Sequence, residues 1–182
     1  MKTPKKTTTD ADDLLVLNLF GDIEYANNGA LDLIDTLNRV LLGQINPEPE
    51  AIHVYMTSHG GMFILAKVII NRITECNRMG IPVYVHAIGA CSSCAMDILV
   101  SAKNENHKTR IIEKDCVLWQ HELRKEFTVT GSLDCEDENS RYKIDTRYRE
   151  ELYLRSANKG TSTSKIKALF TDAMHNLSLI HI

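Results

Sequence analysis

The sequence has no long apolar run, no excess of one charge and few aromatic side chains. No apolar stretch approaches the roughly 18 residues that a membrane-spanning helix needs. The 182 residues include 21 basic and 24 acidic side chains, a net charge of −3. This near balance gives no reason to expect a nucleic acid or a membrane as the main partner. With 43% hydrophobic residues, the chain is typical of one globular domain, which we expect to be soluble and cytoplasmic.

Signals for export and for disulfide bonding are also lacking. Residues 1–9 (MKTPKKTTT) carry a basic cluster without the apolar segment of a signal peptide. We expect residues 1–13 to form a disordered arm. Five cysteines, at positions 76, 91, 94, 116 and 135, are an odd number in a chain without an export signal. Reduced thiols are therefore expected rather than a disulfide framework.

From residue 14 onward, strand patterns alternate with helix patterns. Short apolar or alternating runs predict strands at 14–20, 52–57, 81–88, 109–112 and 116–120. The remaining patterned segments predict helices at 29–43, 63–76, 93–102, 141–158 and 161–170. The polar stretch 124–140 predicts a loop or extension. This order favours an α/β fold with helices packed on a mostly parallel sheet.

Two junctions between a strand and the next helix are rich in small residues. The first junction is 58–61 (Ser-His-Gly-Gly), and the second junction is 89–93 (Gly-Ala-Cys-Ser-Ser). Glycine permits positive φ and a close approach of the backbone to a ligand. The start of a helix offers N–H groups and a field that favours negative charge. We therefore expect the chemistry of the protein at these two junctions.

Ser93, at the end of the second junction, is the candidate nucleophile. A serine hydroxyl attacks well only when a base takes its proton and donors stabilise the oxyanion that forms. The Cys94 amide would lie beside Ser93, and the Gly60 and Gly61 amides would lie close if the junctions are neighbours in the sheet. The simpler alternative is that Ser92 or Ser93 caps a helix, which spacing alone favours.

His121 is the candidate base, because it follows an apolar strand where charged sequence begins and can face a cleft there. A histidine in such a place is more often a partly exposed residue without a catalytic task. His59, inside the first junction, is a second candidate.

Cys91 and Cys94 have the CxxC spacing of redox and zinc sites. The sequence has no second pair of this kind and no nearby His-x-x-x-His to complete four ligands. A single pair is a weak signal, so we expect it to have neither a redox role nor a metal-binding role.

Taken together, three segments resemble the ClpP family, the proteolytic subunits of Clp protease. Residues 54–62 (VYMTSHGGM) resemble its strand and Ser-Pro-Gly-Gly turn, and 88–95 (IGACSSCA) resemble its Ile-Gly-x-Ala-x-Ser-Met-Gly segment. In that pattern the nucleophile lies four residues after the glycine, which selects Ser93 over Ser92. Residues 117–121 (VLWQH) are similar to the strand that ends in the catalytic histidine. The resemblance covers 14–176.

This resemblance implies the ClpP/crotonase fold of stacked β-β-α units, with the helix predicted at 141–158 as a protruding handle. It also implies a serine endopeptidase whose site residues are Ser93, His121 and Asp172, with the Gly60 and Cys94 amides as oxyanion hole. Members of the family form heptameric rings stacked as a tetradecamer that cleaves unfolded polypeptides. An AAA+ unfoldase supplies these substrates and uses the ATP, so the resemblance implies no cofactor here.

The sequence departs from the family pattern at several positions. His59 replaces a proline, Cys94 and Ala95 replace methionine and glycine, and the polar stretch 129–140 replaces a glycine-rich segment that lies beside the substrate. Asp172 fits the pattern only with a one-residue deletion, and a surface aspartate at a helix end is the alternative.

Two other functions stay open. One is a catalytically inactive ring subunit. The other is a crotonase-type acyl-CoA enzyme that uses the same junctions for a thioester. The order of serine and histidine, without an acidic residue at the second junction, favours the peptidase.

Residues 177–182 (LSLIHI) differ from the helix and strand with which the family continues. They can be encoded by CTG TCT CTT ATA CAC ATC, which resembles a transposon end used in sequencing-library adapters. We therefore expect these residues to be a non-native tail and the domain to lack its C-terminal end.

Overall fold

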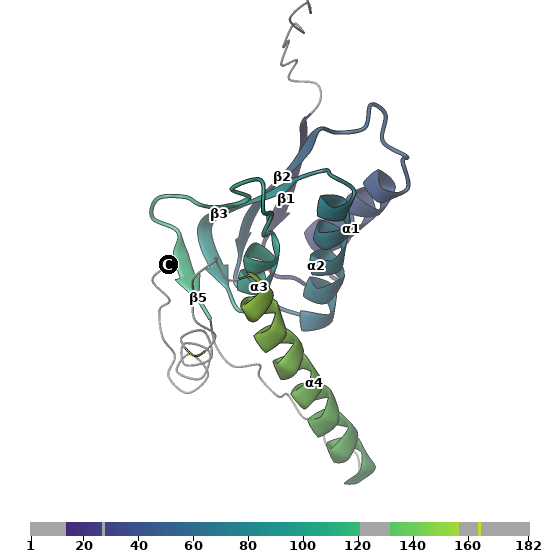
Figure 1. Ribbon diagram of the computed structural model, residues 1–182. Coiled ribbons are helices and arrows are strands. Elements are labelled where there is room, and N and C mark those ends of the chain that lie inside the picture. Colours follow the sequence, from purple (N-terminus) through teal and green to yellow (C-terminus); the bar gives the residue numbers. More distant parts are fainter. Residues whose placement is uncertain (1–13, 27, 121–131, 157–163, 165–182) are drawn as a thin grey trace, which may run out of the picture.

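The computed structural model describes residues 14–26, 28–120, 132–156 and 164 of the chain. Within them, strands alternate with helices as the sequence predicts, which confirms the α/β fold (Figure 1). The elements in chain order are β1 (Leu14–Phe20), α1 (Asn28–Leu41), β2 (Ala51–Ser58), α2 (Phe63–Arg78), β3 (Val83–Ser92), α3 (Cys94–Ser101), β4 (Arg110–Ile112), β5 (Val117–Trp119) and α4 (Ser132–Ser156).

The strands form one sheet in which every described pair is parallel. The order is β1-β2-β3-β4, and β5 also pairs with β3. The two short strands follow one another along β3, since β4 pairs with Val85–Ala87 and β5 with Ala90–Ser92. Parallel strands bring their carboxyl ends to the same edge of a sheet. The first junction, the second junction and the end of β5 are therefore neighbours in space.

One face of the sheet packs against α1, α2 and α3, and this layer holds the core (Figure 1). Ile52, Val54 and Met56 of β2 are fully buried on that face, as the alternating pattern of the strand predicts. Full burial of each such side chain stabilises the fold by about 1.5–3 kcal/mol. The other face of β2 and β3 carries ring side chains instead, with His53 stacked on Tyr84 at 4.7 Å between ring centroids.

Strand β3 is longer than predicted, and the prediction that it ends at residue 88 is wrong. The strand continues through Gly89 to Ser92 because the pairing with β2 shifts there: Met56 pairs with Ala87, and Ser58 pairs with Cys91. Gly89 has a φ of +82°, which suits the irregularity. A Cβ on Gly89 would lie 3.1 Å from Thr57 Oγ1, and Thr57 Oγ1 accepts a hydrogen bond from the Ala90 amide at 3.2 Å.

Helix α4 also begins earlier than predicted, at Ser132 rather than near 141, so the loop predicted over 124–140 is wrong for 132–140. The sequence SLDCEDEN has no apolar residues at helical spacing, so it lacks the periodicity from which a helix is predicted. Its acidic residues favour the start of a helix, where the helix dipole is positive. A helix that projects from the body needs no continuous apolar face, and Figure 1 shows α4 projecting in this way. The helix predicted at 161–170 lies outside the described residues except for Ser164.

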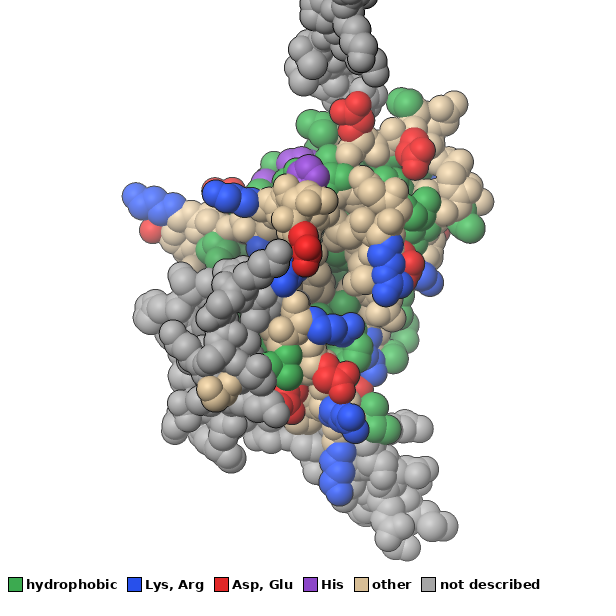
Figure 2. Space-filling view, viewed as in Figure 1, with side chains coloured by type: hydrophobic (Ala, Val, Ile, Leu, Met, Phe, Trp, Pro, Cys, Tyr) green, Lys and Arg blue, Asp and Glu red, His purple; other side chains and the backbone are tan. Residues whose placement is uncertain are grey.

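Charged side chains of both signs are scattered over the face shown in Figure 2, as the balanced composition predicts. Among the described residues, no helix combines the length and apolar character needed to cross a membrane.

Candidate active site

Ser93 stands between β3 and α3 in a backbone conformation that serine rarely adopts. Its φ is 53° and its ψ is −129°, close to the first central position of a type II′ turn, which glycine normally occupies. Asp115 is the other non-glycine residue with positive φ in the described chain, and aspartate tolerates that region better. A serine held in such a turn between strand and helix has its hydroxyl presented rather than packed away.

The first junction lies directly against Ser93. A Cβ added to Gly60 would lie 2.6 Å from Ser93 Cβ and 3.2 Å from Ser93 Oγ, so no other residue fits at position 60 without a shift. Gly60 also has a φ of +100°. Gly61 packs as closely against the backbone of Ile23, because a Cβ on Gly61 would lie 2.5 Å from the Ile23 carbonyl oxygen. The two junctions therefore meet, as their position at one sheet edge requires.

The structure distinguishes Ser93 from its neighbour Ser92. Ser92 is buried, with 5% of its surface exposed, and pairs with Trp119 in the sheet. Ser93 is half-buried. It occupies the N-cap position of α3, but within the described chain its side chain makes no capping hydrogen bond. The helix-cap alternative for Ser93 is therefore wrong, because its hydroxyl does not satisfy the amides of the helix.

Strand β5 brings the chain that leads to His121 next to the second junction. The Ser93 amide donates a hydrogen bond to the Trp119 carbonyl oxygen at 2.8 Å. His121 follows Trp119 by two residues, which span at most about 7 Å of chain. His121 itself lies outside the described residues, as does Asp172, so their side chains are not placed. His59 is exposed at the first junction, and no hydrogen bond joins it to Ser93 in the described chain.

The two amides predicted to form the oxyanion hole differ in their surroundings. Cys94 is the first residue of α3, so its N–H has no acceptor within the helix. The Gly60 amide donates to Ser58 Oγ at 3.1 Å. The orientation of the Cys94 N–H thus follows from its place at the start of α3. The Gly60 N–H, in contrast, already donates to Ser58 at the end of β2.

The CxxC pair of the second junction is buried and unreactive in character. Cys91 and Cys94 are free thiols, with 0% and 1% of their surfaces exposed. Burial raises the pKa of the Cys94 thiol to about 12 and raises that of Cys91 further above its ordinary value. A redox or metal-binding thiol needs a lowered pKa and access to solvent. In the described residues, no three His, Cys, Asp or Glu side chains are grouped to hold a metal ion.

A buried polar cluster behind Ser93 was not predicted from the sequence. Asp97 of α3 and Arg149 of α4 form an ion pair with 0% and 1% side-chain exposure, and Gln120 donates to Asp97. The aspartate in the apolar helix CAMDILVS was a visible signal, because a buried carboxylate requires a partner. Its partner could not be read from the sequence, since Arg149 lies 52 residues away.

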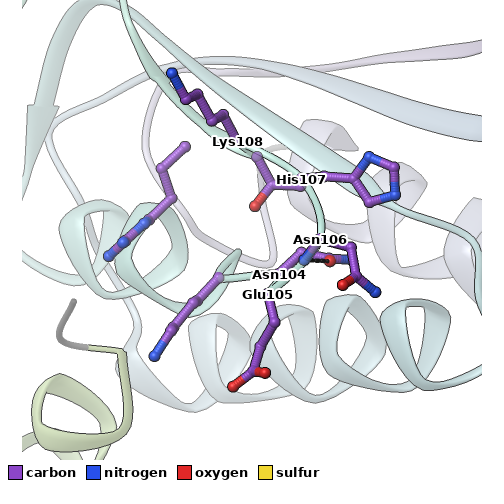
Figure 3. A pocket seen from close by; sticks show the side chains of 8 residues that line it. Asn104, Glu105, Asn106, His107 and Lys108 are labelled. Carbon is purple, nitrogen blue, oxygen red and sulfur yellow. Dashed lines mark hydrogen bonds between the residues drawn. The ribbon is translucent and has the colours of Figure 1, made fainter. Parts of the chain in front are cut away.

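A surface hollow also lies in the loop between α3 and β4 (Figure 3). It is lined by 103–110, and the labelled side chains of Figure 3 are polar or charged. Among the described site residues, Gly60, Ser93 and Cys94 do not line it, so this hollow is separate from the two junctions.

Comparisons with known proteins support the fold. No family model and no curated protein sequence matches the chain. A solved structure does: a point mutant of ClpP1 from Listeria monocytogenes, with a TM-score of 0.63 and 19% sequence identity. The match covers 87% of this chain and 78% of that chain. The chain has a ClpP-like fold. At this identity the likeness shows the fold alone, which is the architecture expected from the sequence.

Proposed function

We propose that this chain is the proteolytic subunit of a Clp-type serine endopeptidase. Ser93 is the nucleophile, His121 the general base and Asp172 the residue that orients the base. The observation that carries the proposal is the backbone of Ser93, which has a positive φ and lies against Gly60. A fold that only needed a turn here would be better served by glycine at position 93. The ClpP-like fold adds independent support.

In the proposed reaction, Ser93 Oγ attacks the carbonyl carbon of a peptide bond while His121 accepts the hydroxyl proton. The negative charge that develops on the carbonyl oxygen is stabilised by the Cys94 amide at the start of α3. The Gly60 amide can join it if it exchanges Ser58 Oγ for the oxyanion. His121 then gives its proton to the leaving amine, and water hydrolyses the resulting acyl-enzyme.

The proposal extends to the assembly and its substrates. An extended polypeptide whose main chain pairs with an exposed strand edge beside the site would present its peptide bonds to Ser93 without strong sequence preference. By likeness of fold, we propose heptameric rings stacked as a tetradecamer and an AAA+ unfoldase as the partner that uses ATP. On this proposal the chain itself requires no cofactor.

A fluorophosphonate probe tests the site without the unfoldase, because it reacts with serines whose base and oxyanion donors are assembled. We expect mass spectrometry to find the label on Ser93. Both Ser93→Ala and His121→Ala should lose it, whereas Ser92→Ala, the matched control at the buried neighbour, should keep it. An unlabelled Ser93 would contradict the proposal and favour a catalytically inactive ring subunit. Specific binding of coenzyme A would favour the crotonase-type alternative.

A further inference from the structure

Behind Ser93, one turn further along α3, lies an ion pair that the proposed reaction does not use. Arg149 donates through Nε at 3.0 Å and through Nη2 at 2.8 Å to Asp97 Oδ2. The guanidinium also lies 5.2 Å from the centroid of the Phe63 ring. Burial raises the pKa of the Asp97 carboxyl, and the Arg149 charge opposes that rise. The pair thus joins α3, α4 and the start of α2 at one buried point.

Gln120 links this pair to the strand that precedes His121. Its side-chain amide donates to Asp97 Oδ1 at 2.9 Å and to the Tyr153 hydroxyl at 2.8 Å, and only 3% of the residue is exposed. The residue before it, Trp119, accepts the hydrogen bond from the Ser93 amide. Trp119 is therefore bonded at the start of α3, through Ser93, and Gln120 is bonded one turn later, through Asp97. His121 is the next residue in the chain.

Stability alone does not explain why a charged pair occupies this place. Replacing a buried ion pair by apolar side chains of similar volume is often neutral or stabilising. The pair does fix the orientation of the Asp97 carboxylate. Because Arg149 holds one oxygen, the other oxygen lies at one defined position. Here that oxygen, Oδ1, is the acceptor for Gln120.

We propose that Asp97 is a positioning residue which, through Gln120, fixes the chain before His121 relative to Ser93. Arg149 compensates the charge of Asp97 and holds it in place. This inference rests on the proposed function in assigning His121 as the base. The positioning itself is a property of the described residues and can be tested separately.

The test compares Gln120→Met, which removes the side-chain hydrogen bonds to Asp97 and Tyr153 at similar size, with the wild-type chain. Leu37→Ala is the matched control: it truncates a fully buried side chain of α1 and should lower stability at least as much. One readout is the rate of fluorophosphonate labelling at Ser93 as a function of pH, which reports the state of the base. The other is hydrogen exchange of the Ser93 amide, whose acceptor is the Trp119 carbonyl oxygen.

We expect Gln120→Met to slow labelling by about 10- to 100-fold, since small misplacements of catalytic groups cost this much. It should also displace the pH profile and speed exchange of the Ser93 amide, and Leu37→Ala should do neither. If Gln120→Met does not fold, the double variant Asp97→Leu, Arg149→Leu removes the same anchor with apolar side chains and should show the same changes.

Labelling and amide exchange equal to wild type in Gln120→Met would overturn the proposal. If wild-type Ser93 is not labelled at all, the proposed function fails, and amide exchange still decides the positioning. Faster exchange in Gln120→Met than in Leu37→Ala would support it, and equal exchange would overturn it.

Discussion

The first and second junctions both connect a parallel strand to a helix, but they use different residues at the turn. Each leads from a parallel strand into a helix and passes through positive φ. The first uses Gly60 and Gly61, at φ of +100° and +139°, which adopt such angles without steric cost. The second uses Gly89 within the strand but places Ser93, a residue with a side chain, at the turn itself. The contrast shows that the chain has a serine at position 93, although its positive φ is costly for a residue with a side chain.

The close fit between the junctions gives the largest expected effect. In Gly60→Ala, the new methyl group would lie 2.6 Å from Ser93 Cβ, so Ser93 or the first junction must move. We expect fluorophosphonate labelling of Ser93 to be abolished. Displacement of a single oxyanion donor already costs about 100- to 1,000-fold in comparable sites.

The matched control is Gly80→Ala. Gly80 has a φ of +90°, but no atom lies within 4 Å of an added Cβ. This variant should lose only about 1 kcal/mol of stability and should label normally. Equal labelling of Gly60→Ala and Gly80→Ala would show that contact between the junctions does not matter to the site.

Local sequence was sufficient to locate the junctions, because each of their features is local. A strand pattern that runs into glycines and then into an apolar helix marks each junction, and the sequence predicted that Gly60 lies close to Ser93 only if β2 and β3 are neighbours. The structure shows that they are neighbours and that the two residues meet. The extension of β3 beyond Gly89 was not predictable in this way, since it depends on a shifted pairing with β2.

The network behind the second junction depends on contacts that no local pattern contains. Asp97 pairs with Arg149, which lies 52 residues further along the chain. Arg149 belongs to α4, a helix whose polar sequence does not indicate a buried face. The sequence pattern places Gln120 only within a predicted strand, although its side chain contacts both Asp97 and Tyr153. Buried polar pairs between distant elements require the tertiary structure, and here they lie next to the predicted site.

The thiols of the second junction offer a smaller, chemical test of how tightly it is packed. Burial raises the pKa of Cys94 from 9.0 to about 12. At pH 9 its thiolate fraction in the folded protein is thus about a thousandth, against about half in the unfolded chain, so native alkylation should be several hundredfold slower. The rate should keep rising with pH above 9 instead of levelling off.

Peptide-resolved alkylation with iodoacetamide, in native and urea-unfolded protein, measures this difference. The same pKa shift makes the folded state hold its thiol proton more strongly, so stability should fall as pH rises above about 9. Equally rapid modification of Cys94 in both states would show that the second junction opens readily and would revive a redox role for the pair.

The smallest expected effect tests the strain at Ser93 directly. Its turn conformation costs about 1–3 kcal/mol for a residue with a Cβ, and glycine removes that cost. The greater freedom of glycine in the unfolded chain offsets roughly 0.5–1 kcal/mol of the gain. Ser93→Gly should therefore be more stable than Ser93→Ala by about 1 kcal/mol, a rise of about 2–4 °C in Tm, while both lose the fluorophosphonate label.

Asp115→Gly is the matched control for this comparison. Asp115 has a φ of 70°, but aspartate tolerates that region, and the side chain is exposed in a turn. Its replacement should not raise Tm. If Ser93→Gly is no more stable than Ser93→Ala, the serine is not strained, and its conformation no longer argues for a catalytic hydroxyl. If it is more stable, the chain retains at position 93 a residue that the fold alone would not favour, at the point where Gly60 lies directly against it.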